Sequence, residues 1–283
     1  MEPDTDRSGI VRVAVVTAGG AGIGASTAAA LTASGWAVVA VDVDAGALDA
    51  LAAAGSCAAT VVGDVTSDDV LVEARRKAEG LGRLAGWVNN AGVNQRRRID
   101  LVEPEIVRRI VDVDLMATFR GSQLAVQSFL ASGTAGTIVN VSSIHGRFAF
   151  PGCAVYDMCK GGVEALTRYL AVEYGPLGIR ANTVAPGAVR TDSVEEFIAG
   201  SPDPARTRWE SENLAPLGRM AEPGEVAEVI VFLMAPTGSA ISGQVIAVDG
   251  GSSARCYRYE PDAELLAFRP DPRTAPAHEE RAG

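Results

Sequence analysis

The chain has 283 residues, of which 47% are hydrophobic and 21% are charged, and this globular composition excludes global disorder. Lys and Arg total 25 against 35 Asp and Glu, a formal net charge of −10, which argues against sequence-independent nucleic-acid binding and against an anionic membrane surface. No apolar run reaches the about 20 residues of a membrane span, and the acidic start MEPDTDRSG does not resemble a secretory signal.

Apolar runs alternate with helical patterns along the chain. We expect strands at 11–17, 36–41, 58–62, 84–89, 136–141, 179–184 and 243–248. Helices are expected at 22–34, 45–53, 68–79, 103–130, 154–174 and 223–234. Most of these strands are continuous apolar runs, typical of strands that are buried on both faces. The alternation predicts a single doubly wound α/β domain with a parallel sheet and helices on both faces.

Three segments lie outside this regular alternation. Residues 1–10 form an N-terminal extension before the domain at 11–251. Residues 190–216 are polar and too long for an ordinary connection, which predicts a substrate lid. Residues 252–283 contain four prolines among mixed charges and form a C-terminal arm. That arm is either partly disordered or placed across a subunit boundary.

The cysteines and histidines are few. The four cysteines are Cys57, Cys153, Cys159 and Cys256. Their spacing fits neither a zinc site nor a dense disulfide framework, so we expect reduced thiols in a cytoplasmic protein. The two histidines, His145 and His278, exclude a His-rich metal centre, and no metal site is predicted.

A glycine-rich turn, TAGGAGIG at 17–24, links the first predicted strand to the first helix. Glycine lets a backbone turn tightly beside a pyrophosphate, and a helix N-terminus offers free N–H groups to it. We therefore expect Ala18, Gly22, Ile23 and Gly24 to bind a dinucleotide cofactor. The alternative is a turn with a purely structural role.

An acidic residue, Asp42, ends the second predicted strand, 18 residues after Gly24. A carboxylate there accepts hydrogen bonds from ribose hydroxyls and repels a 2′-phosphate, which favours NAD over NADP. Residues 38–51 contain no Lys or Arg that would reverse this preference. The alternative is a solvated acid in a turn. Asp64 and Val65 occupy a similar position after the third strand.

Three side chains suggest proton transfer next to the predicted cofactor. Tyr156 and Lys160 are four residues apart on one predicted helix face. A nearby ammonium lowers the pKa of a phenol, which then exchanges a proton with a substrate oxygen. Ser143 follows the fifth predicted strand, 13 residues before Tyr156, at the same sheet edge. Its flanks lack the G-x-S-x-G pattern of a hydrolase nucleophile, so the group favours hydride transfer.

Together these motifs resemble the short-chain dehydrogenase/reductase family. The resemblance covers 11–251 and includes the glycine turn, Asp64-Val65, Asn89-Asn90-Ala91-Gly92, Ser143, Tyr156 with Lys160, Pro186-Gly187, Pro216-Leu217-Gly218-Arg219 and Val248-Asp249-Gly250-Gly251. It implies a Rossmann-type domain with about seven parallel strands. It also implies a homo-oligomer, a dimer or tetramer, whose interfaces use the helices at 103–130 and 154–174.

The resemblance also implies residue roles. Tyr156 is the acid/base, Lys160 holds the nicotinamide ribose and lowers the pKa of Tyr156, and Ser143 orients the substrate oxygen. Further cofactor contacts are implied for Asp64, Val65, Asn90, Val189 and Thr191.

Two residues depart from the family pattern. Ala18 stands where the family has Gly, which costs about 1 kcal/mol if its φ is positive. Asp114 stands where the family has an Asn that helps to hold a water chain from the lysine to solvent. The charge of Asp114 would raise the pKa of Lys160 and offset the effect of that lysine on Tyr156. We predict an active enzyme with a shifted pH optimum.

The substrate pocket is less well defined by the sequence. Its candidate residues are Asn94, Gln95, His145, Phe148, Cys153, Ala188 and Trp209. His145 either meets a polar group of the substrate or faces solvent, and the basic run at 96–98 either attracts an anionic substrate or is simply solvated.

The leading prediction is an NAD-dependent oxidoreductase that acts on a small secondary alcohol or its ketone. The alternatives are a reductase of 3-oxoacyl or polyketide-type ketones and, from another class, a catalytically silent NAD-binding regulator.

Overall fold

The computed structural model describes residues 10–255. The chain up to Ser253 forms one compact unit. Most of the predicted N-terminal extension, and the predicted C-terminal arm from residue 256 onward, lie outside the described residues.

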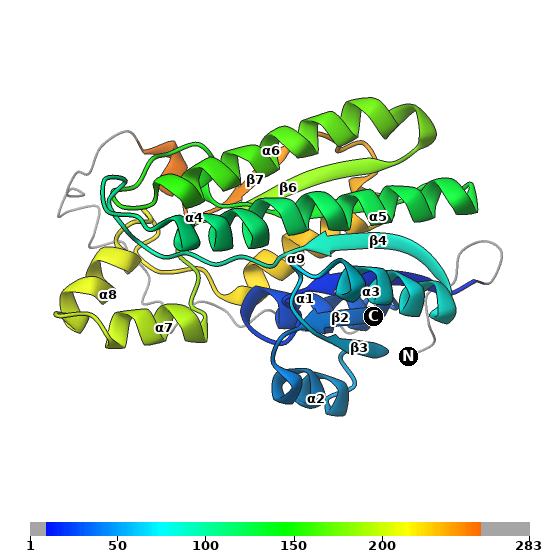
Figure 1. Cartoon of the computed structure of the whole chain (residues 1–283), viewed down its shortest axis with the longest axis horizontal. Helices are drawn as coiled ribbons and strands as arrows, with labels where there is room; N and C mark the ends of the chain where they lie inside the picture. Colours follow the sequence, from blue (N-terminus) through cyan, green and yellow to red (C-terminus); the bar gives the residue numbers. More distant parts are fainter. Residues whose placement is uncertain (1–9, 256–283) are drawn as a thin grey trace, which may run out of the picture. The chain divides into compact units, whose positions relative to one another are not determined.

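A seven-stranded parallel sheet forms the centre of this unit, with the strand order β3-β2-β1-β4-β5-β6-β7 (Figure 1). Its strands are β1 (Arg12–Thr17), β2 (Ala37–Asp42), β3 (Ala59–Val62), β4 (Arg83–Asn89), β5 (Thr137–Val141), β6 (Arg180–Pro186) and β7 (Val245–Val248). The predicted doubly wound α/β domain, with its parallel sheet and helices on both faces, is confirmed.

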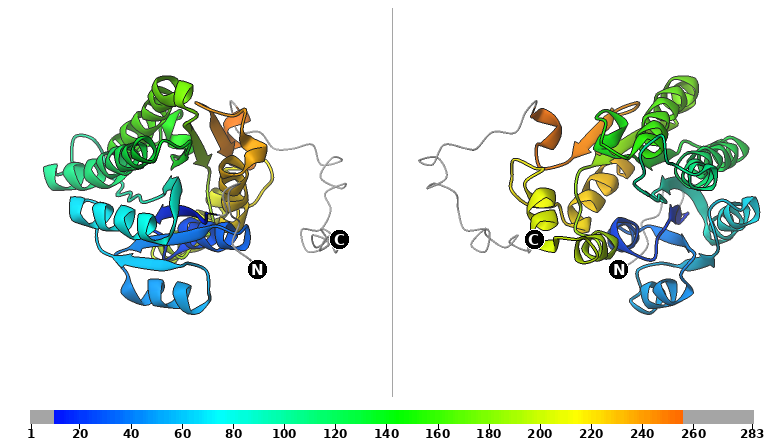
Figure 2. Two further views of the ribbon diagram at one scale, coloured as in Figure 1. Left: turned by 90° about the vertical axis from the view of Figure 1, so that its right-hand side faces the viewer. Right: turned by 60° about the vertical axis from the view of Figure 1, so that its left-hand side comes forward.

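Helices follow the strands in the expected order. They are α1 (Gly22–Ala33), α2 (Ala45–Ala53), α3 (Asp68–Leu81), α4 (Pro104–Val111), α5 (Ala117–Ser132), α6 (Ala154–Tyr174), α7 (Asp192–Ala199), α8 (Pro204–Glu212) and α9 (Pro223–Met234). Short 3₁₀ turns occur at Ile144–Gly146, Gly175–Leu177, Pro236–Gly238 and Ser252–Ala254. Figure 2 shows α5 and α6 (green) on one side of the sheet and α9 (yellow-orange) on the other.

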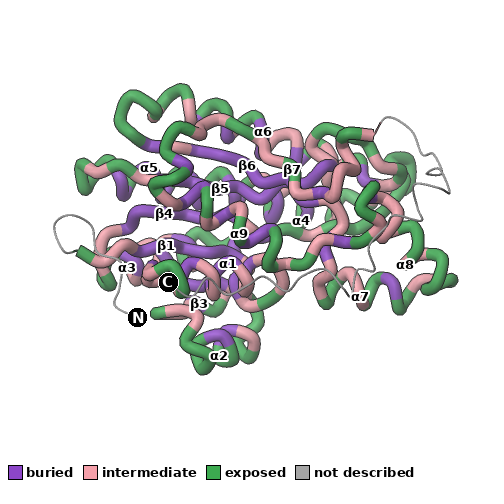
Figure 3. Tube along the Cα trace, turned by 180° about the vertical axis from the view of Figure 1, so that it is seen from behind, coloured by how far each residue is buried: buried purple, intermediate pink, exposed green. Residues whose placement is uncertain are grey.

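The core has two halves, one on each face of the sheet. Successive β1 side chains point to opposite faces, so Val15 belongs to the core cluster that also contains Leu124 of α5. Val16 belongs to the cluster on the other face, which also contains Leu31 of α1. Figure 3 shows the resulting buried strands between helices that expose their outer surfaces. Burial on both faces explains why the strands are continuous apolar runs.

The helical stretch predicted at 103–130 is confirmed, but its centre is π-helical and not α-helical. A π-helical turn at Asp112–Met116 separates α4 from α5. The wider turn changes the backbone hydrogen bonding, and the Thr118 hydroxyl donates to the Asp114 carbonyl at 3.1 Å. Single π-turns inside helices often occur at functional sites, and this one carries Asp114.

The segment at 190–216, predicted as a substrate lid, contains α7 and α8. Each helix begins at a side-chain cap, because Thr191 accepts a hydrogen bond from the Val194 N–H and Asp203 accepts one from the Arg206 N–H. An ion pair between Arg208 and Glu195 joins the two helices. Within residues 10–255, no helix has the length and apolar character needed to cross a membrane.

Candidate active site

The predicted site residues gather where the parallel strands end. The glycine turn follows β1, and the segments that carry Asn90, Ser143 and Val189 follow β4, β5 and β6. Because these strands run parallel, all four segments lie at the same edge of the sheet, where α/β proteins bind their ligands.

The glycine turn has the close backbone packing that a dinucleotide site needs. A Cβ atom on Gly24 would lie 1.8 Å from the Ala18 carbonyl oxygen, so only glycine fits there. Ala18 has φ +48°, which makes it the one non-glycine residue with positive φ in the described chain. The conditional prediction of strain at this position is therefore confirmed, at a cost of about 1 kcal/mol.

Asn90 holds this turn from the neighbouring strand. Its side-chain amide donates to the carbonyl oxygens of Thr17 and Ala18 at 3.1 and 3.2 Å. Its backbone N–H donates to the Thr17 hydroxyl at 2.9 Å. These contacts give Asn90 an indirect role, because it shapes the backbone on which a pyrophosphate would rest.

Asp42 lies against the glycine turn at the end of β2. One carboxylate oxygen accepts the Gly20 N–H at 2.9 Å and the other accepts the Asp44 N–H at 3.1 Å. Each oxygen has a second lone pair for a further donor. A half-buried carboxylate beside a glycine cradle at a helix N-terminus fits the adenosine half of a dinucleotide.

Asp64 and Val65 lie after β3, at the same edge. Val65 is buried in the core. One Asp64 oxygen accepts the N–H and hydroxyl of Thr66, and the other accepts from Arg109 at 2.8 Å. Although burial acts to raise the pKa of Asp64, the bonds from Thr66 and Arg109 hold that pKa below its usual value. The Asp64 carboxylate is thus held in place by its hydrogen bonds with Thr66 and Arg109.

The segment after β6 reaches the glycine turn. Val189 is buried and pairs with Ala221 in a β-bridge. The methyl group of Thr191 lies 3.0 Å from the position that a Cβ on Gly22 would take. Gly22, with φ +51°, therefore permits this close approach.

Ser143, Tyr156 and Lys160 come together as predicted from their spacing. Lys160 Nζ lies 5.2 Å from the centre of the Tyr156 ring, one helical turn away on α6. The Ser143 hydroxyl lies near enough to the phenol to lower the pKa of Tyr156, against the larger effect of burial. The Ser143 hydroxyl also lies 3.4 Å from the Pro186 carbonyl oxygen, to which it donates.

Lys160 forms a buried ion pair with Asp114. Lys160 Nζ lies 3.3 Å from Asp114 Oδ2, and their side chains are only 3% and 0% exposed. Lys160 also donates to the Val141 carbonyl at 3.2 Å, and Asp114 Oδ1 accepts the Val93 N–H at 2.7 Å. Gly92 lies so close that an added Cβ would be 3.2 Å from Lys160 Nζ.

The titration of this group differs from the prediction in one respect. Burial raises the pKa of Tyr156, and the positive charge of Lys160 lowers it only in part. Burial would lower the pKa of Lys160, but Tyr156 and Asp114 raise it. Burial raises the pKa of Asp114, against the opposing charge of Lys160. As predicted, the charge of Asp114 raises the pKa of Lys160, and the charge of Lys160 lowers that of Tyr156. The prediction that the pKa of Tyr156 falls below its ordinary value is wrong for this structure, because burial raises it.

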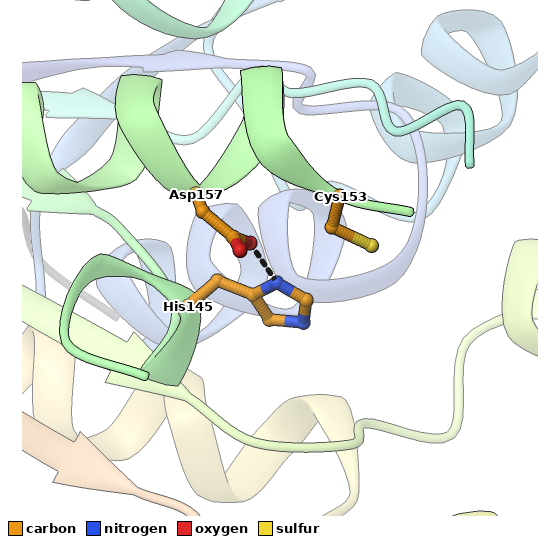
Figure 4. A group of neighbouring side chains, drawn as sticks. All are labelled: His145, Cys153 and Asp157. Atoms are coloured by element: carbon orange, nitrogen blue, oxygen red, sulfur yellow. Dashed lines mark hydrogen bonds and ion pairs between the residues drawn. The ribbon is translucent and has the colours of Figure 1, made fainter. Parts of the chain in front are cut away.

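His145 occupies a well-defined position beside Tyr156 (Figure 4). Its Nδ1 lies 2.6 Å from Asp157 Oδ1. Its ring stacks on Phe150, with centroids 3.9 Å apart, and meets the Tyr156 ring edge-on at 5.1 Å. The sequence did not single out Asp157 or Phe150. The only signal was that Asp157 directly follows Tyr156 and lies four residues after Cys153.

Cys153 places a thiol near this pair. One side-chain nitrogen of His145, the Cys153 Sγ and one carboxylate oxygen of Asp157, atoms of the kind that bind metals, lie within 4.8 Å of one another. The sequence spacing did not predict this cluster. The 2.6 Å separation of His145 Nδ1 and Asp157 Oδ1 is that of a hydrogen bond, so a proton occupies the position between them. The Asn94 side-chain N–H points to Cys153 Sγ at 3.9 Å.

The other predicted pocket residues are less constrained. Phe148 is 43% exposed, and Trp209 on α8 is 54% exposed. Arg96 lies over the Phe197 ring at 5.3 Å, which joins the segment after β4 to α7. A role for Trp209 in covering a substrate remains a prediction.

A parallel sheet, a glycine cradle at the start of α1 and a Ser-Tyr-Lys group at one edge define a Rossmann-type oxidoreductase. The sequence model of a family described as Enoyl-(Acyl carrier protein) reductase matches residues 17–253. The chain belongs to the short-chain dehydrogenase/reductase family, whose members bind a nicotinamide cofactor.

Known relatives act on alcohols and ketones. A cis-4-hydroxycyclohexanecarboxylate dehydrogenase of Sinomonas cyclohexanicum is 41% identical over 86% of this chain and 97% of the relative. A cyclohexanol dehydrogenase of Acinetobacter sp. (strain SE19) is 33% identical over 86% and 96%. The crystal structure of levodione reductase matches with a TM-score of 0.82 at 32% identity, over 87% of this chain and 98% of that one.

Proposed function

We propose that the protein is an NAD-dependent oxidoreductase that interconverts a small secondary alcohol and its ketone. The grouping of Ser143, Tyr156 and Lys160 beside the glycine turn carries this proposal. The names of the relatives support the substrate class, since two of these enzymes are named for substrates with a hydroxylated cyclohexane ring.

Each residue of the group has a distinct task in the proposed reaction. Tyr156 donates its phenolic proton to the carbonyl oxygen during reduction and takes a proton from the hydroxyl during oxidation. Ser143 orients the substrate oxygen by a hydrogen bond. Lys160, held by Asp114, stabilises the phenolate by its charge. When it is bound, the nicotinamide accepts or supplies the hydride.

The cofactor would lie along the strand ends. Ala18, Gly22, Ile23 and Gly24 would bind the pyrophosphate through backbone N–H groups. Asp42 would accept from the adenosine ribose, and Asp64 and Val65 would flank the adenine side. The other residues proposed to contact the cofactor are Tyr156, Lys160, Val189 and Thr191, and Asn90 would support the cofactor by holding the glycine turn.

Asp42 provides a test of the NAD preference. In a panel of secondary alcohols and ketones followed by nicotinamide absorbance, we expect turnover with NAD to exceed that with NADP. Asp42→Asn keeps an acceptor for the Gly20 N–H but removes the charge that repels a 2′-phosphate. The preference should then fall by about 10-fold or more. The control Asp49→Asn changes an exposed acid of α2 and should leave the preference unchanged.

The same panel separates the alternatives. Faster turnover of 3-oxoacyl thioesters than of simple ketones, with NADPH preferred, would favour a reductase of 3-oxoacyl or polyketide-type ketones. NAD binding without turnover of any substrate would favour a silent regulator. An NAD preference that survives Asp42→Asn would remove Asp42 from cofactor selection.

Asp114 is expected to set the pH dependence. Oxidation needs Tyr156 without its proton, so its rate rises with pH through the pKa of Tyr156. The charge of Asp114 raises that pKa, so Asp114→Asn should move the rise to lower pH, by about half a unit to one unit. The measurement is kcat/KM for alcohol oxidation against pH. Asp112→Asn, an exposed site in the same π-turn, is the control, and identical profiles for Asp114→Asn and wild type would contradict the role.

Assembly and location are part of the proposal. We expect a homo-oligomer, dimer or tetramer, that uses the region of α4 to α6. Its support is the set of large apolar side chains exposed on α5 and α6: Phe119, Leu130, Met158, Tyr169 and Val172. The free thiols of Cys57, Cys153 and Cys159 suit a reducing compartment such as the cytoplasm.

A further inference from the structure

The imidazole of His145 is restrained on three sides. Asp157 Oδ1 lies 2.6 Å from Nδ1, Phe150 stacks on one face at an interplanar angle of 18°, and Tyr156 meets the ring at 83°. The backbone N–H of His145 also points to the Ser143 hydroxyl at 3.3 Å. The ring is therefore held in one orientation beside two of the groups proposed to act on the substrate.

Asp157 determines which nitrogen of this ring carries the proton. Its second oxygen accepts the Phe150 N–H at 3.0 Å, so both carboxylate oxygens have fixed partners. An ionised carboxylate only accepts hydrogen bonds, so the Nδ1 of His145 must be the donor. In a neutral ring, Nε2 then keeps its lone pair. Figure 4 shows Nε2 on the side of the ring that faces away from Asp157.

The surroundings favour the neutral ring. Burial lowers the pKa of His145, and the positive charges of Arg96 and Lys160 lower it further. Asp157 raises it by its hydrogen bond and charge, but the net pKa lies below the ordinary histidine value. At neutral pH, His145 thus presents a hydrogen-bond acceptor and no net charge.

We propose that His145 is a specificity-determining residue whose Nε2 accepts a hydrogen bond from a second hydroxyl group of the substrate, close to the reacting carbon. The inference rests on the proposed function. It names the substrate class as diols and the matching hydroxyketones. Asp157 is a positioning residue that acts through His145, since it fixes the ring and its proton.

Three related alcohols test this specificity. Cyclohexane-1,2-diol offers a donor next to the reacting carbon, 2-methoxycyclohexanol offers only an acceptor there, and cyclohexanol offers neither. In the wild-type protein, we expect kcat/KM for the diol to exceed that for the methyl ether by about 10- to 100-fold, because a site built for a hydroxyl rejects analogues that lack it. His145→Phe should bring this ratio close to one, whatever its effect on absolute rates.

A substitution at Asp157 provides a second, independent readout. In Asp157→Asn, the side-chain oxygen can stay with the Phe150 N–H while the new amide N–H donates to Nδ1. The proton of His145 would then move to Nε2, and the preference for the diol should fall by about 10-fold or more. Nitrogen NMR of histidine-labelled protein without an affinity tag reports this change directly. The chain has only two histidines, so His278→Gln assigns the His145 signals and serves as the control for the diol ratio.

These measurements distinguish a failure of the diol specificity from a failure of the proposed oxidoreductase activity. If the wild type oxidises none of these alcohols and reduces none of the ketones, the proposed function and the inference both fail. If cyclohexanol is oxidised but the diol and the methyl ether react equally well, only the inference is overturned. A proton on Nε2 in the wild type would overturn it. A preference for 2-hydroxycyclohexanecarboxylate that is lost in His145→Phe would also overturn it, since a carboxylate only accepts hydrogen bonds and so needs a proton on Nε2.

Discussion

Replacing Tyr156 with phenylalanine is expected to lower the turnover of any accepted alcohol or ketone by about 10²- to 10⁴-fold. The substitution removes one oxygen atom and keeps the ring that packs edge-on against His145. Without that oxygen, nothing at this position exchanges a proton with the substrate. Steady-state rates with saturating cofactor measure the loss.

The control for this prediction lies on the same helix. Tyr169 is 55% exposed on α6 and contacts Tyr174, so Tyr169→Phe should leave turnover unchanged. Tyr156→Phe should still bind NAD, which calorimetry can show. If Tyr156→Phe retained turnover within a few-fold of wild type, the proton would have to pass through another group, and the proposed mechanism would be wrong.

Removing the cation from the buried ion pair should have the second large effect, on stability. Lys160→Met is expected to lower the free energy of unfolding by about 3–5 kcal/mol, because it leaves Asp114 buried without its partner. Asp114 and Lys160 are almost completely buried, so water cannot replace the lost charge. Urea unfolding of both proteins at one pH measures the difference.

A double variant separates charge from packing. Lys160→Met with Asp114→Asn has no unpaired charge, so it should regain a large part of the lost stability.

The free energy of unfolding of the single variant Lys160→Met should also depend on pH. Burial already raises the pKa of Asp114, and loss of Lys160 raises it further. A carboxyl whose folded-state pKa is raised stabilises the fold below its unfolded pKa and loses this contribution as pH rises through the folded value. Lys160→Met should therefore be most destabilised at neutral and higher pH. If Lys160→Met and the double variant lost the same free energy of unfolding, the effect would come from packing alone.

Much of the fold was predictable because its signals are local. Short continuous apolar runs such as 11–17 and 84–89 are typical of strands covered on both faces, and they alternate with helical patterns. The steric demand at Gly24 and the face shared by Tyr156 and Lys160 also follow from short-range geometry. The remaining site assignments rested on the family resemblance.

The features that escaped prediction depend on contacts between distant segments. The hydrogen bond of His145 with Asp157 requires the 3₁₀ turn after β5 to pack on α6. The π-turn at Asp112–Met116 leaves no mark in the apolar pattern, because both halves of the helix keep their own periodicity. The net pKa of Tyr156 depends on how deeply the phenol is buried, which helix spacing alone does not give.

The π-turn also affects how this site can change in evolution. It places an additional residue between α4 and α5, so these two helices need not keep the same rotational phase. Deletion of one residue from this turn would restore an ordinary helical register and carry Asp114 away from Lys160.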